Sequence, residues 1–169
     1  MTEDRKTQGL VLPLSVQENI CLPSVERFSR LSVVSGRQEA EAAAQFQKDL
    51  RIKTTGLGQR VMNLSGGNQQ KVVLSKWLCS RGDILIFDEP TRGIDVGSKA
   101  EIYQLMNQLT EAGAAIIMIS SDLPEVLGMS DRVLVISNGR VVREFGRADA
   151  TPESVGAAMT AAAGEAEAA

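Results

Sequence analysis

The sequence predicts an α/β fold in which a helical lobe precedes part of a parallel-sheet core. Residues 1–82 carry helical patterns, and from residue 83 short apolar runs alternate with helical ones. The chain has 169 residues, of which 43% are hydrophobic and 23% charged, so it has enough apolar material for a core. We expect an opening loop and helical lobe at 1–82, an α/β part at 83–160, and an alanine- and glutamate-rich tail at 161–169.

Three helices are expected in the lobe, after an opening loop over residues 1–14. Ser15 is followed three residues later by Glu18, a capping box that starts a short helix. A second helix, rich in alanine, glutamine and glutamate, is expected from about 36 to 51. The third covers about 65–80, where apolar residues follow at helical spacing.

The α/β part begins with a strand, a helix and a second strand. Residues 84–88 and 115–119 are apolar runs typical of strands buried on both faces. Between them, residues 97–111 carry one apolar stripe, which predicts an amphipathic helix.

A hairpin and two further helices complete the predicted chain. The dipeptide Asn138-Gly139 separates a strand at 131–136 from a partner strand at 141–145, a strong signal for a tight turn. A short helix is expected after Asp122 and a last helix from Thr151.

The third helix begins in the run Leu-Ser-Gly-Gly-Asn-Gln-Gln-Lys at 64–71. The hydroxyl of Ser65 is expected to accept from backbone N–H groups of the first turn. Gly66 and Gly67 let another molecule approach the backbone closely. Such a helix start suits an anion such as phosphate. The alternative is an ordinary capped helix whose glycines belong to the preceding turn.

Two carboxylates, Asp88 and Glu89, end the strand at 84–88. In open α/β sheets, ligands bind beyond this edge. Asp88 could hold Mg²⁺ directly or through water, and Glu89 could orient or deprotonate a water molecule. The alternative is a pair of solvated acids at a strand end.

Charge, histidine and cysteine content exclude several classes of function. The formal net charge of −3 gives no sign of a nucleic-acid partner. Histidine is absent, which excludes histidine metal sites and Ser-His or Cys-His catalytic pairs. Cys21 and Cys79 are too few for a disulfide framework, fit a reducing compartment, and are interpreted as small apolar filler.

No targeting or membrane segment is predicted. Residues 1–20 are polar and lack the apolar stretch of a signal peptide. The longest strongly apolar run, 114–119, is far too short to span a bilayer. Any membrane role is therefore expected to come through a partner.

Together these runs resemble the ATP-binding-cassette (ABC) ATPases over about residues 1–150. Residues 64–69 resemble the signature motif of that family, 84–89 its Walker B strand with the catalytic glutamate, and Gly-Ile-Asp-Val at 93–96 its D-loop. The resemblance implies a partial P-loop NTPase-like ABC cassette: the helical subdomain plus the second half of the parallel-sheet core.

Two family features are absent from the sequence. No window matches the phosphate loop Gly-x-x-x-x-Gly-Lys-Ser/Thr, so the resemblance implies that the chain begins just after that loop. Ser121 stands where the family usually has a switch histidine, and a serine can hydrogen-bond phosphate but carries no charge.

Longer strings resemble the second cassette of bacterial monosaccharide importers, in which serine at the switch position is usual. The strings are Glu-Asp-Arg-Lys at 3–6, residues 64–71, residues 88–97 and residues 120–128. The resemblance implies ATP and Mg²⁺ as cofactors. It implies catalytic roles for Glu89 and Ser121, contacts to ATP from Ser65, Gly66, Gly67, Gln69 and Asp95, and Mg²⁺ positioning by Asp88.

The same resemblance implies the partners and the cellular place of the chain. It implies head-to-tail pairing with another cassette, sugar permease subunits in the membrane, and indirectly a periplasmic sugar-binding protein. The chain would lie on the cytoplasmic face of the cell membrane. The alternatives are a truncated, non-hydrolysing cassette that only donates its signature or docks on a partner, and a soluble ABC protein of repair or translation. The importer strings argue against the last.

Overall fold

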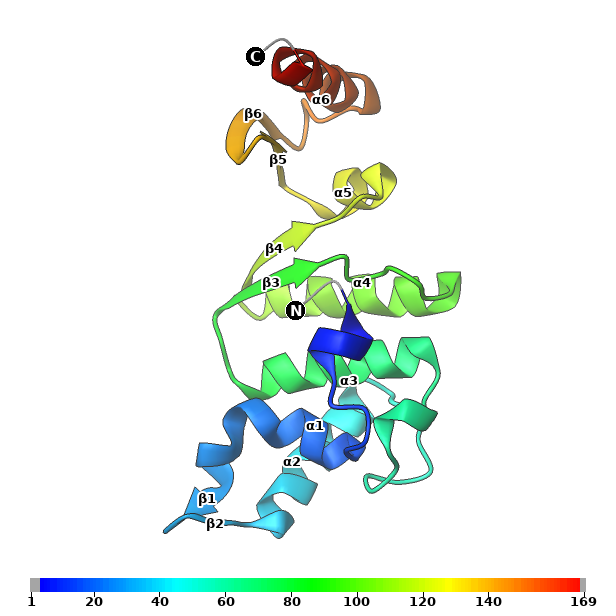
Figure 1. Ribbon diagram of the computed structural model, residues 1–169, viewed down its shortest axis with the longest axis vertical. Coiled ribbons are helices and arrows are strands. Elements are labelled where there is room, and N and C mark those ends of the chain that lie inside the picture. Colours follow the sequence, from blue (N-terminus) through cyan, green and yellow to red (C-terminus); the bar gives the residue numbers. More distant parts are fainter. Residues whose placement is uncertain (1–3, 168–169) are drawn as a thin grey trace. The chain divides into compact units, whose positions relative to one another are not determined.

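The computed structural model describes residues 4–167 and divides the chain into two compact units. Unit 1 is Met1–Ile117 and unit 2 is Met118–Ala169. Figure 1 labels the helices and strands of both units along the chain. Unit 1 holds the predicted helical lobe together with the first strand and helix of the α/β part. The proposed boundary at 82/83 stays a prediction.

Helix α1 (Val16–Cys21) begins at the predicted capping box, which is confirmed. The backbone N–H of Ser15 donates to Glu18 Oε2 at 2.7 Å, and the N–H of Glu18 donates to Ser15 Oγ at 3.2 Å. These bonds satisfy two N–H groups that a helix start leaves without partners. The 3₁₀ helix η2 (Leu22–Phe28), with Pro23 in its first turn, follows directly.

We expect Ser15→Ala to lower the free energy of unfolding by about 1 kcal/mol, the usual loss for an N-cap.

The Ser15 hydroxyl and then its backbone N–H lower the pKa of Glu18. A lowered native-state pKa adds stability above the unfolded-state pKa, and that stability is lost as the pH falls through the native-state value. Thermal unfolding of Glu18→Gln should therefore converge with that of the parent chain below about pH 4. A difference that persists unchanged at pH 3, or one equalled by the exposed-residue control Glu111→Gln, would contradict this.

Two short features of the lobe differ from the prediction. The expected opening loop contains one helical turn, η1 (Arg5–Gly9), because Asp4 Oδ1 accepts from the N–H groups of Lys6 at 2.8 Å and Thr7 at 3.3 Å. A small antiparallel hairpin, β1 (Ser29–Arg30) with β2 (Val33–Val34), lies before α2 (Gly36–Asp49).

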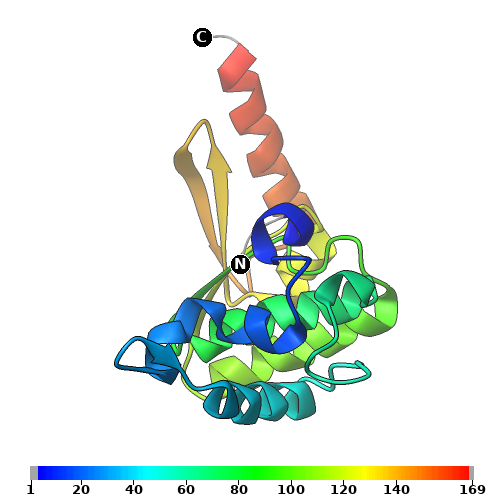
Figure 2. The same cartoon turned by 60° about the horizontal axis from the view of Figure 1, so that its bottom comes forward.

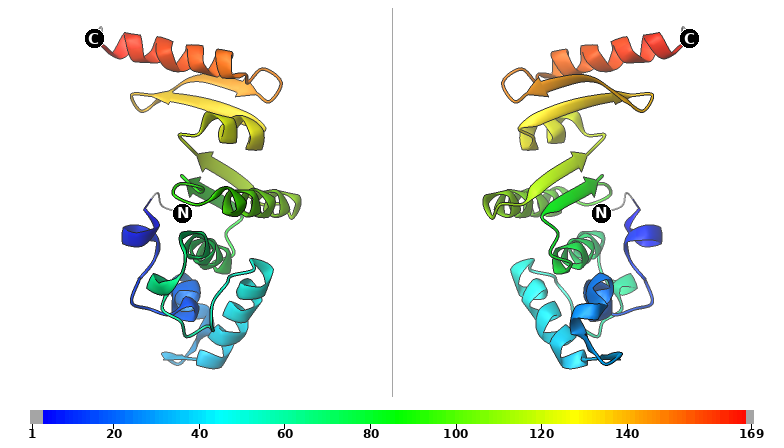
Figure 3. Two further views of the ribbon diagram at one scale, coloured as in Figure 1. Left: turned by 90° about the vertical axis from the view of Figure 1, so that its right-hand side faces the viewer. Right: turned by 90° about the vertical axis from the view of Figure 1, so that its left-hand side faces the viewer.

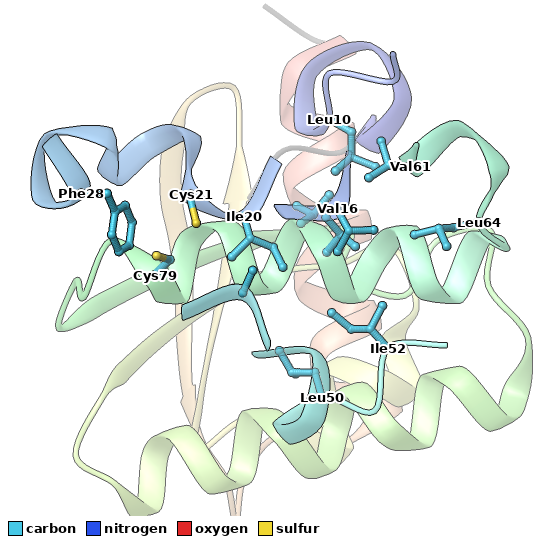
Figure 4. Packing of buried hydrophobic residues seen from close by; sticks show 13 residues of the cluster. Leu10, Val16, Ile20, Cys21, Phe28, Leu50, Ile52, Val61, Leu64 and Cys79 are labelled. Atoms are coloured by element: carbon cyan, nitrogen blue, oxygen red, sulfur yellow. The ribbon is translucent and has the colours of Figure 1, made fainter. Parts of the chain in front are cut away.

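The core of unit 1 is built around α3 (Gly66–Cys79), which begins close to the predicted residue. Figure 4 shows α1, the following η2 and the segment 50–52 placing apolar side chains around this helix. The short 3₁₀ turn η3 (Val61–Asn63) leads into it. The buried members of this cluster are Leu10, Val16, Ile20, Cys21, Phe28, Ala43, Leu50, Ile52, Val61, Leu64, Val72, Val73 and Cys79.

Strand β3 (Ile84–Asp88) and helix α4 (Val96–Glu111) follow α3, and β3 pairs with β4 (Ala115–Ile119). Helix α4 lies along β3, with α3 on its other side (Figures 1 and 3). The predicted apolar stripe of α4 is confirmed by Ile102 and Met106, which are 1% and 4% exposed.

The prediction that these strands are buried on both faces is wrong for this chain. Leu85 and Phe87 of β3 are buried, whereas Ile84 and Ile86 are 66% and 51% exposed. On β4, Ile117 is 52% exposed. Helix α4 covers one face of the pair, and no described residue of unit 1 buries the other. Apolar side chains on both faces are typical of strands that are covered on both sides, and within the described part of unit 1 α4 covers one side.

Unit 2 consists of α5 (Leu123–Met129), the hairpin β5 (Arg132–Ser137) with β6 (Arg140–Gly146), and α6 (Pro152–Glu167). The predicted tight turn is confirmed, with φ of +49° at Asn138 and +72° at Gly139. Figure 2 shows the hairpin beside α6. The buried core of unit 2 comprises Val133, Val135, Phe145 and Val155. Helix α6 extends into the predicted tail, whose last two residues lie outside the described ones.

Among the described residues, no helix has the length and apolar character needed to cross a bilayer.

Candidate functional site

The start of α3 carries the glycine-rich motif, and Ser65 stands at its N-cap position. The expectation that its hydroxyl caps the helix is wrong: no side-chain cap bond forms, and Ser65 Oγ instead accepts from Asn68 Nδ2 at 2.8 Å. Asn68 Oδ1 in turn accepts from the N–H of Lys53 at 2.8 Å. Asn68 therefore ties the exposed hydroxyl of Ser65 to the preceding loop. The first-turn N–H groups have no side-chain cap, as an anion site at a helix N-terminus requires.

The predicted D-loop lies against this helix start. A Cβ atom built on Gly67 would stand 2.4 Å from Ser98 Oγ, 3.0 Å from Ser98 Cβ and 3.9 Å from Asp95 Oδ2. Asp95 is the N-cap of α4, and its carboxylate accepts from the N–H and the hydroxyl of Ser98, both at 2.9 Å. Both bonds lower the pKa of Asp95, and the one from the backbone N–H of Ser98 has the larger effect. The carboxylate is thus charged and fixed beside Gly67.

Two side chains of α3 connect the helix to the segment after β3 and to α4. The buried Gln70 amide donates to the carbonyl of Pro90 at 2.6 Å. The buried ammonium of Lys71 lies 2.6 Å from Glu101 Oε2 and donates to the carbonyl of Arg51 at 3.4 Å. Helix α3, α4 and the segment that follows the acidic end of β3 are therefore held in one packed assembly within unit 1.

The acidic pair lies where β3 ends. Asp88 is the last residue of the strand and is half-buried. Glu89 has φ of +47°, in the left-handed region that a residue with a Cβ rarely adopts, and its carbonyl accepts from the N–H of Arg92 at 3.2 Å. Strained backbone of this kind is concentrated at functional sites, where packing holds it in place. Pro90 and Thr91, both buried, provide that packing.

Two further predicted site residues have different surroundings. Gln69 is 4% exposed, and its amide donates to the carbonyl of Val61 at 3.0 Å. Ser121 is exposed in the loop between β4 and α5, in unit 2. Next to it, Ser120 Oγ donates to Glu125 Oε2 at 2.7 Å and accepts from the N–H of Asp122 at 3.1 Å. Their roles toward ATP stay predictions.

Three further residues hold the site together, and the sequence does not predict a role for them: Asn68, Gln70 and Ser98. Each is a small or medium polar residue next to a motif residue, and such residues are common on exposed helix turns. The only sequence signal was their place within or beside the motifs. What distinguishes each of them is one neighbour from a segment distant along the chain: Lys53 for Asn68, Pro90 for Gln70 and Gly67 for Ser98.

We expect Gln70→Ala to lower the free energy of unfolding by about 1–3 kcal/mol, because the carbonyl of Pro90 would be left buried without this donor. Chemical denaturation monitored through Trp77 would measure the loss. The exposed Gln108 of α4 offers a matched control, for which Gln108→Ala should change stability by less than about 0.5 kcal/mol. Equal effects of the two substitutions would contradict the anchoring role of Gln70.

Known proteins match this chain over the segments that form this site. The family model for the ABC transporter matches residues 5–92. A ribose import ATP-binding protein of Streptomyces avermitilis is 58% identical over 153 residues, which is 90% of this chain and 29% of that protein. A xylose import ATP-binding protein of Thermoanaerobacter pseudethanolicus is 54% identical, over 92% of this chain and 31% of that protein. The chain thus spans less than a third of each of these relatives.

Solved structures support the same assignment. The ATP-binding cassette MJ0796, in a dimeric post-hydrolysis state bound to ADP and phosphate, has a TM-score of 0.69 and 25% identity. The match covers 83% of this chain and 60% of that one. A metal-chelate type ABC transporter in an inward-facing conformation, at 14% identity and a TM-score of 0.76, shares the fold over 89% of this chain. The chain is a partial ATP-binding cassette and belongs to the ABC transporter family.

Proposed function

We propose that this chain supplies the signature, Walker B and D-loop portions of the ATP-binding subunit of a bacterial monosaccharide importer. One observation carries the proposal: the start of α3 with its uncapped N–H groups, the loop after β3 and Asp95 are packed together in unit 1. The sugar class rests on the relatives, which are named for import of ribose and xylose.

In this function, ATP is held between two cassettes arranged head to tail. Ser65, Gly66 and Gly67 would face the γ-phosphate of ATP bound on the partner cassette, where N–H donors and the positive end of the helix dipole favour an anion. Gln69 is buried, and its role would be indirect. Its bond to the carbonyl of Val61 would hold the first turn of α3 in place. Asp95 would cross to the partner at the interface.

The donor set around β3 suits Mg²⁺. Mg²⁺ is usually bound by one or two carboxylates, with water and phosphate oxygens completing its shell, not by an all-protein cage. The described residues contain no group of three or more histidine, cysteine, aspartate or glutamate residues arranged for a metal, which agrees with a site completed by nucleotide. Asp88 would hold the ion, which when bound would neutralise charge on the phosphates.

The proposed chemistry is attack of water on the γ-phosphate. Glu89 would orient and polarise that water, and Ser121 would hydrogen-bond the phosphate. Phosphoryl transfer depends mainly on positioning and charge stabilisation, so these residues act only together with a phosphate loop. The exposed faces of Ile84, Ile86 and Ile117 would be covered by the segment that carries that loop.

Calorimetric titration of the purified chain with ATP and Mg²⁺ tests whether nucleotide binding requires a phosphate loop in addition to the residues of this chain. We expect no binding up to millimolar nucleotide. A chimera in which this chain replaces the matching 153 residues of the Streptomyces avermitilis relative should restore both binding and hydrolysis. Micromolar binding by the chain alone would overturn the proposal, and so would an inactive chimera that folds.

A second candidate function follows from the sequence, which contains no phosphate-loop motif in its 169 residues. The chain alone would then act as a non-hydrolysing module that donates its signature to another cassette. A pull-down with a complete cassette distinguishes the two, because such a module should be retained only when ATP is present.

A further inference from the structure

The turn that follows β3 holds Glu89 in a backbone conformation that its own sequence disfavours. Glu89 is half-buried, has φ of +47°, and is followed by a proline. A positive φ is rare for a residue with a Cβ, and a following proline further restricts the backbone toward extended conformations. Strain of this kind persists where the surrounding structure fixes the backbone. The direction of the Glu89 side chain therefore depends on the contacts that hold this turn.

Hydrogen bonds from within the turn and from helix α3 hold it in place. The carbonyl of Glu89 accepts from the N–H of Arg92 at 3.2 Å, which closes a four-residue turn with Pro90 at its second position, where proline is favoured. The proline ring fixes its own φ but not its ψ, which sets the direction of its carbonyl. The amide of Gln70 donates to that carbonyl at 2.6 Å. A side chain of α3 thus fixes a torsion that the proline ring leaves free.

The contact between Gln70 and the turn is closed to solvent. Pro90 is less than 2% exposed, Gln70 is 4% exposed and Thr91 is 3% exposed. A buried carbonyl that loses its donor carries the full cost of its desolvation. Without the Gln70 amide, the carbonyl of Pro90 is therefore expected to rotate toward another donor or toward water, and this rotation would move the neighbouring Glu89.

We propose that Gln70 is a positioning residue for ATP hydrolysis, whose amide holds the turn after β3 so that the Glu89 carboxylate can polarise the attacking water. The inference rests on the proposed function, in which Glu89 has that role. Gln70 acts through Glu89, because its buried side chain is directed at the backbone of Pro90. A misplacement of about 1 Å can cost about 10²-fold in rate, so a small shift of the turn is enough to matter.

The neighbouring Gln69 provides a matched comparison within the same helix turn. Both glutamines are 4% exposed, and each donates its amide to a backbone carbonyl. The acceptor of Gln69 is Val61 in η3, whereas the acceptor of Gln70 directly follows Glu89. A purely structural role would make the two glutamines behave alike, and a positioning role would distinguish them.

The first experiment measures hydrolysis in the chimera with the Streptomyces avermitilis relative. Gln70→Met keeps the length of the side chain and nearly its volume but removes the donor. We expect kcat to fall by about 10- to 100-fold, while the affinity for ATP stays within a few-fold of that of the parent chimera. An unchanged kcat in a folded variant would overturn the proposal.

A double-mutant cycle with Glu89→Gln tests whether Gln70 acts through Glu89. If it does, adding Gln70→Met to Glu89→Gln should lower kcat by less than about twofold, because the group that Gln70 positions is already lost. Gln69→Met should lower kcat by the same factor in both backgrounds. Equal factors for Gln70→Met in the two backgrounds would show that it acts through general stability. Where Gln70→Met fails to fold, Gln70→Asn, whose amide is one methylene shorter, takes its place in the cycle.

Amide hydrogen exchange in this chain, without nucleotide, tests the hold on the turn separately from the proposed function. In Gln70→Met, the N–H of Arg92 should exchange about tenfold faster or more, while that of Leu74 in the buried part of α3 changes much less. Unchanged exchange at Arg92 would overturn the inference even where the parent chimera is inactive. Faster exchange at Arg92 together with an inactive parent chimera would support the hold on the turn and overturn the proposed function instead.

Discussion

Glu89→Gln is expected to reduce ATP hydrolysis by about 10²–10⁴-fold in the chimera with the Streptomyces avermitilis relative, the loss typical of a positioned general base. The prediction rests on the proposed function. Glutamine has nearly the same size and adopts φ of +47° no less readily than glutamate, so the turn after β3 should keep its shape. Nucleotide affinity should therefore remain within a few-fold of the parent chimera, while kcat falls.

Steady-state phosphate release and calorimetry on the same preparation would measure the two quantities. Glu111→Gln, at the exposed end of α4, removes one carboxylate from the same unit and should leave both unchanged. If Glu89→Gln retained more than a tenth of the parent kcat, another residue would have to polarise the water. If affinity and kcat fell together, Glu89 would act through the fold of the loop.

Most long elements could be predicted because their signals are local. The capping box of Ser15 and Glu18 and the turn at Asn138-Gly139 each carry a residue-level preference that tertiary contacts did not overrule. The hairpin of β1 and β2 could not be predicted in this way. Its turn places Leu31 and Ser32 at φ of +52° and +63°, where glycine or asparagine would be the sequence signal.

Burial was predicted less well than secondary structure. Buried and exposed residues alternate in β3, but all of its first four side chains are apolar, so the sequence does not show the alternation. A strand carries apolar side chains on both faces when both are covered in the complete cassette. Likewise, the site motifs could be identified from the sequence, but the contact of Gly67 with Ser98 depends on folding.

Gly67→Ala is expected to lower the free energy of unfolding of unit 1 by about 1–3 kcal/mol, as overpacking of a close contact does. The added methyl would meet Ser98 Oγ at 2.4 Å. Rotation of that hydroxyl would relieve the contact but break its bond to Asp95, and Ser98 Cβ would still lie at 3.0 Å. The gain in helix propensity from alanine, about 1 kcal/mol, offsets only part of this cost.

A double-mutant cycle with Ser98→Ala makes the prediction specific. Removal of the hydroxyl takes away the closest contact, so the double variant should lose about 0.5–1 kcal/mol less than the sum of the single variants. Gly36→Ala, at the start of α2 where nothing lies within 4 Å of the added Cβ, serves as the control and should be nearly neutral. Strict additivity of Gly67→Ala and Ser98→Ala in chemical denaturation would mean that the start of α3 and the Asp95 cap move independently. In that case the signature and the D-loop would form two separate surfaces, and the proposed joint contact with a partner cassette would lose its structural basis.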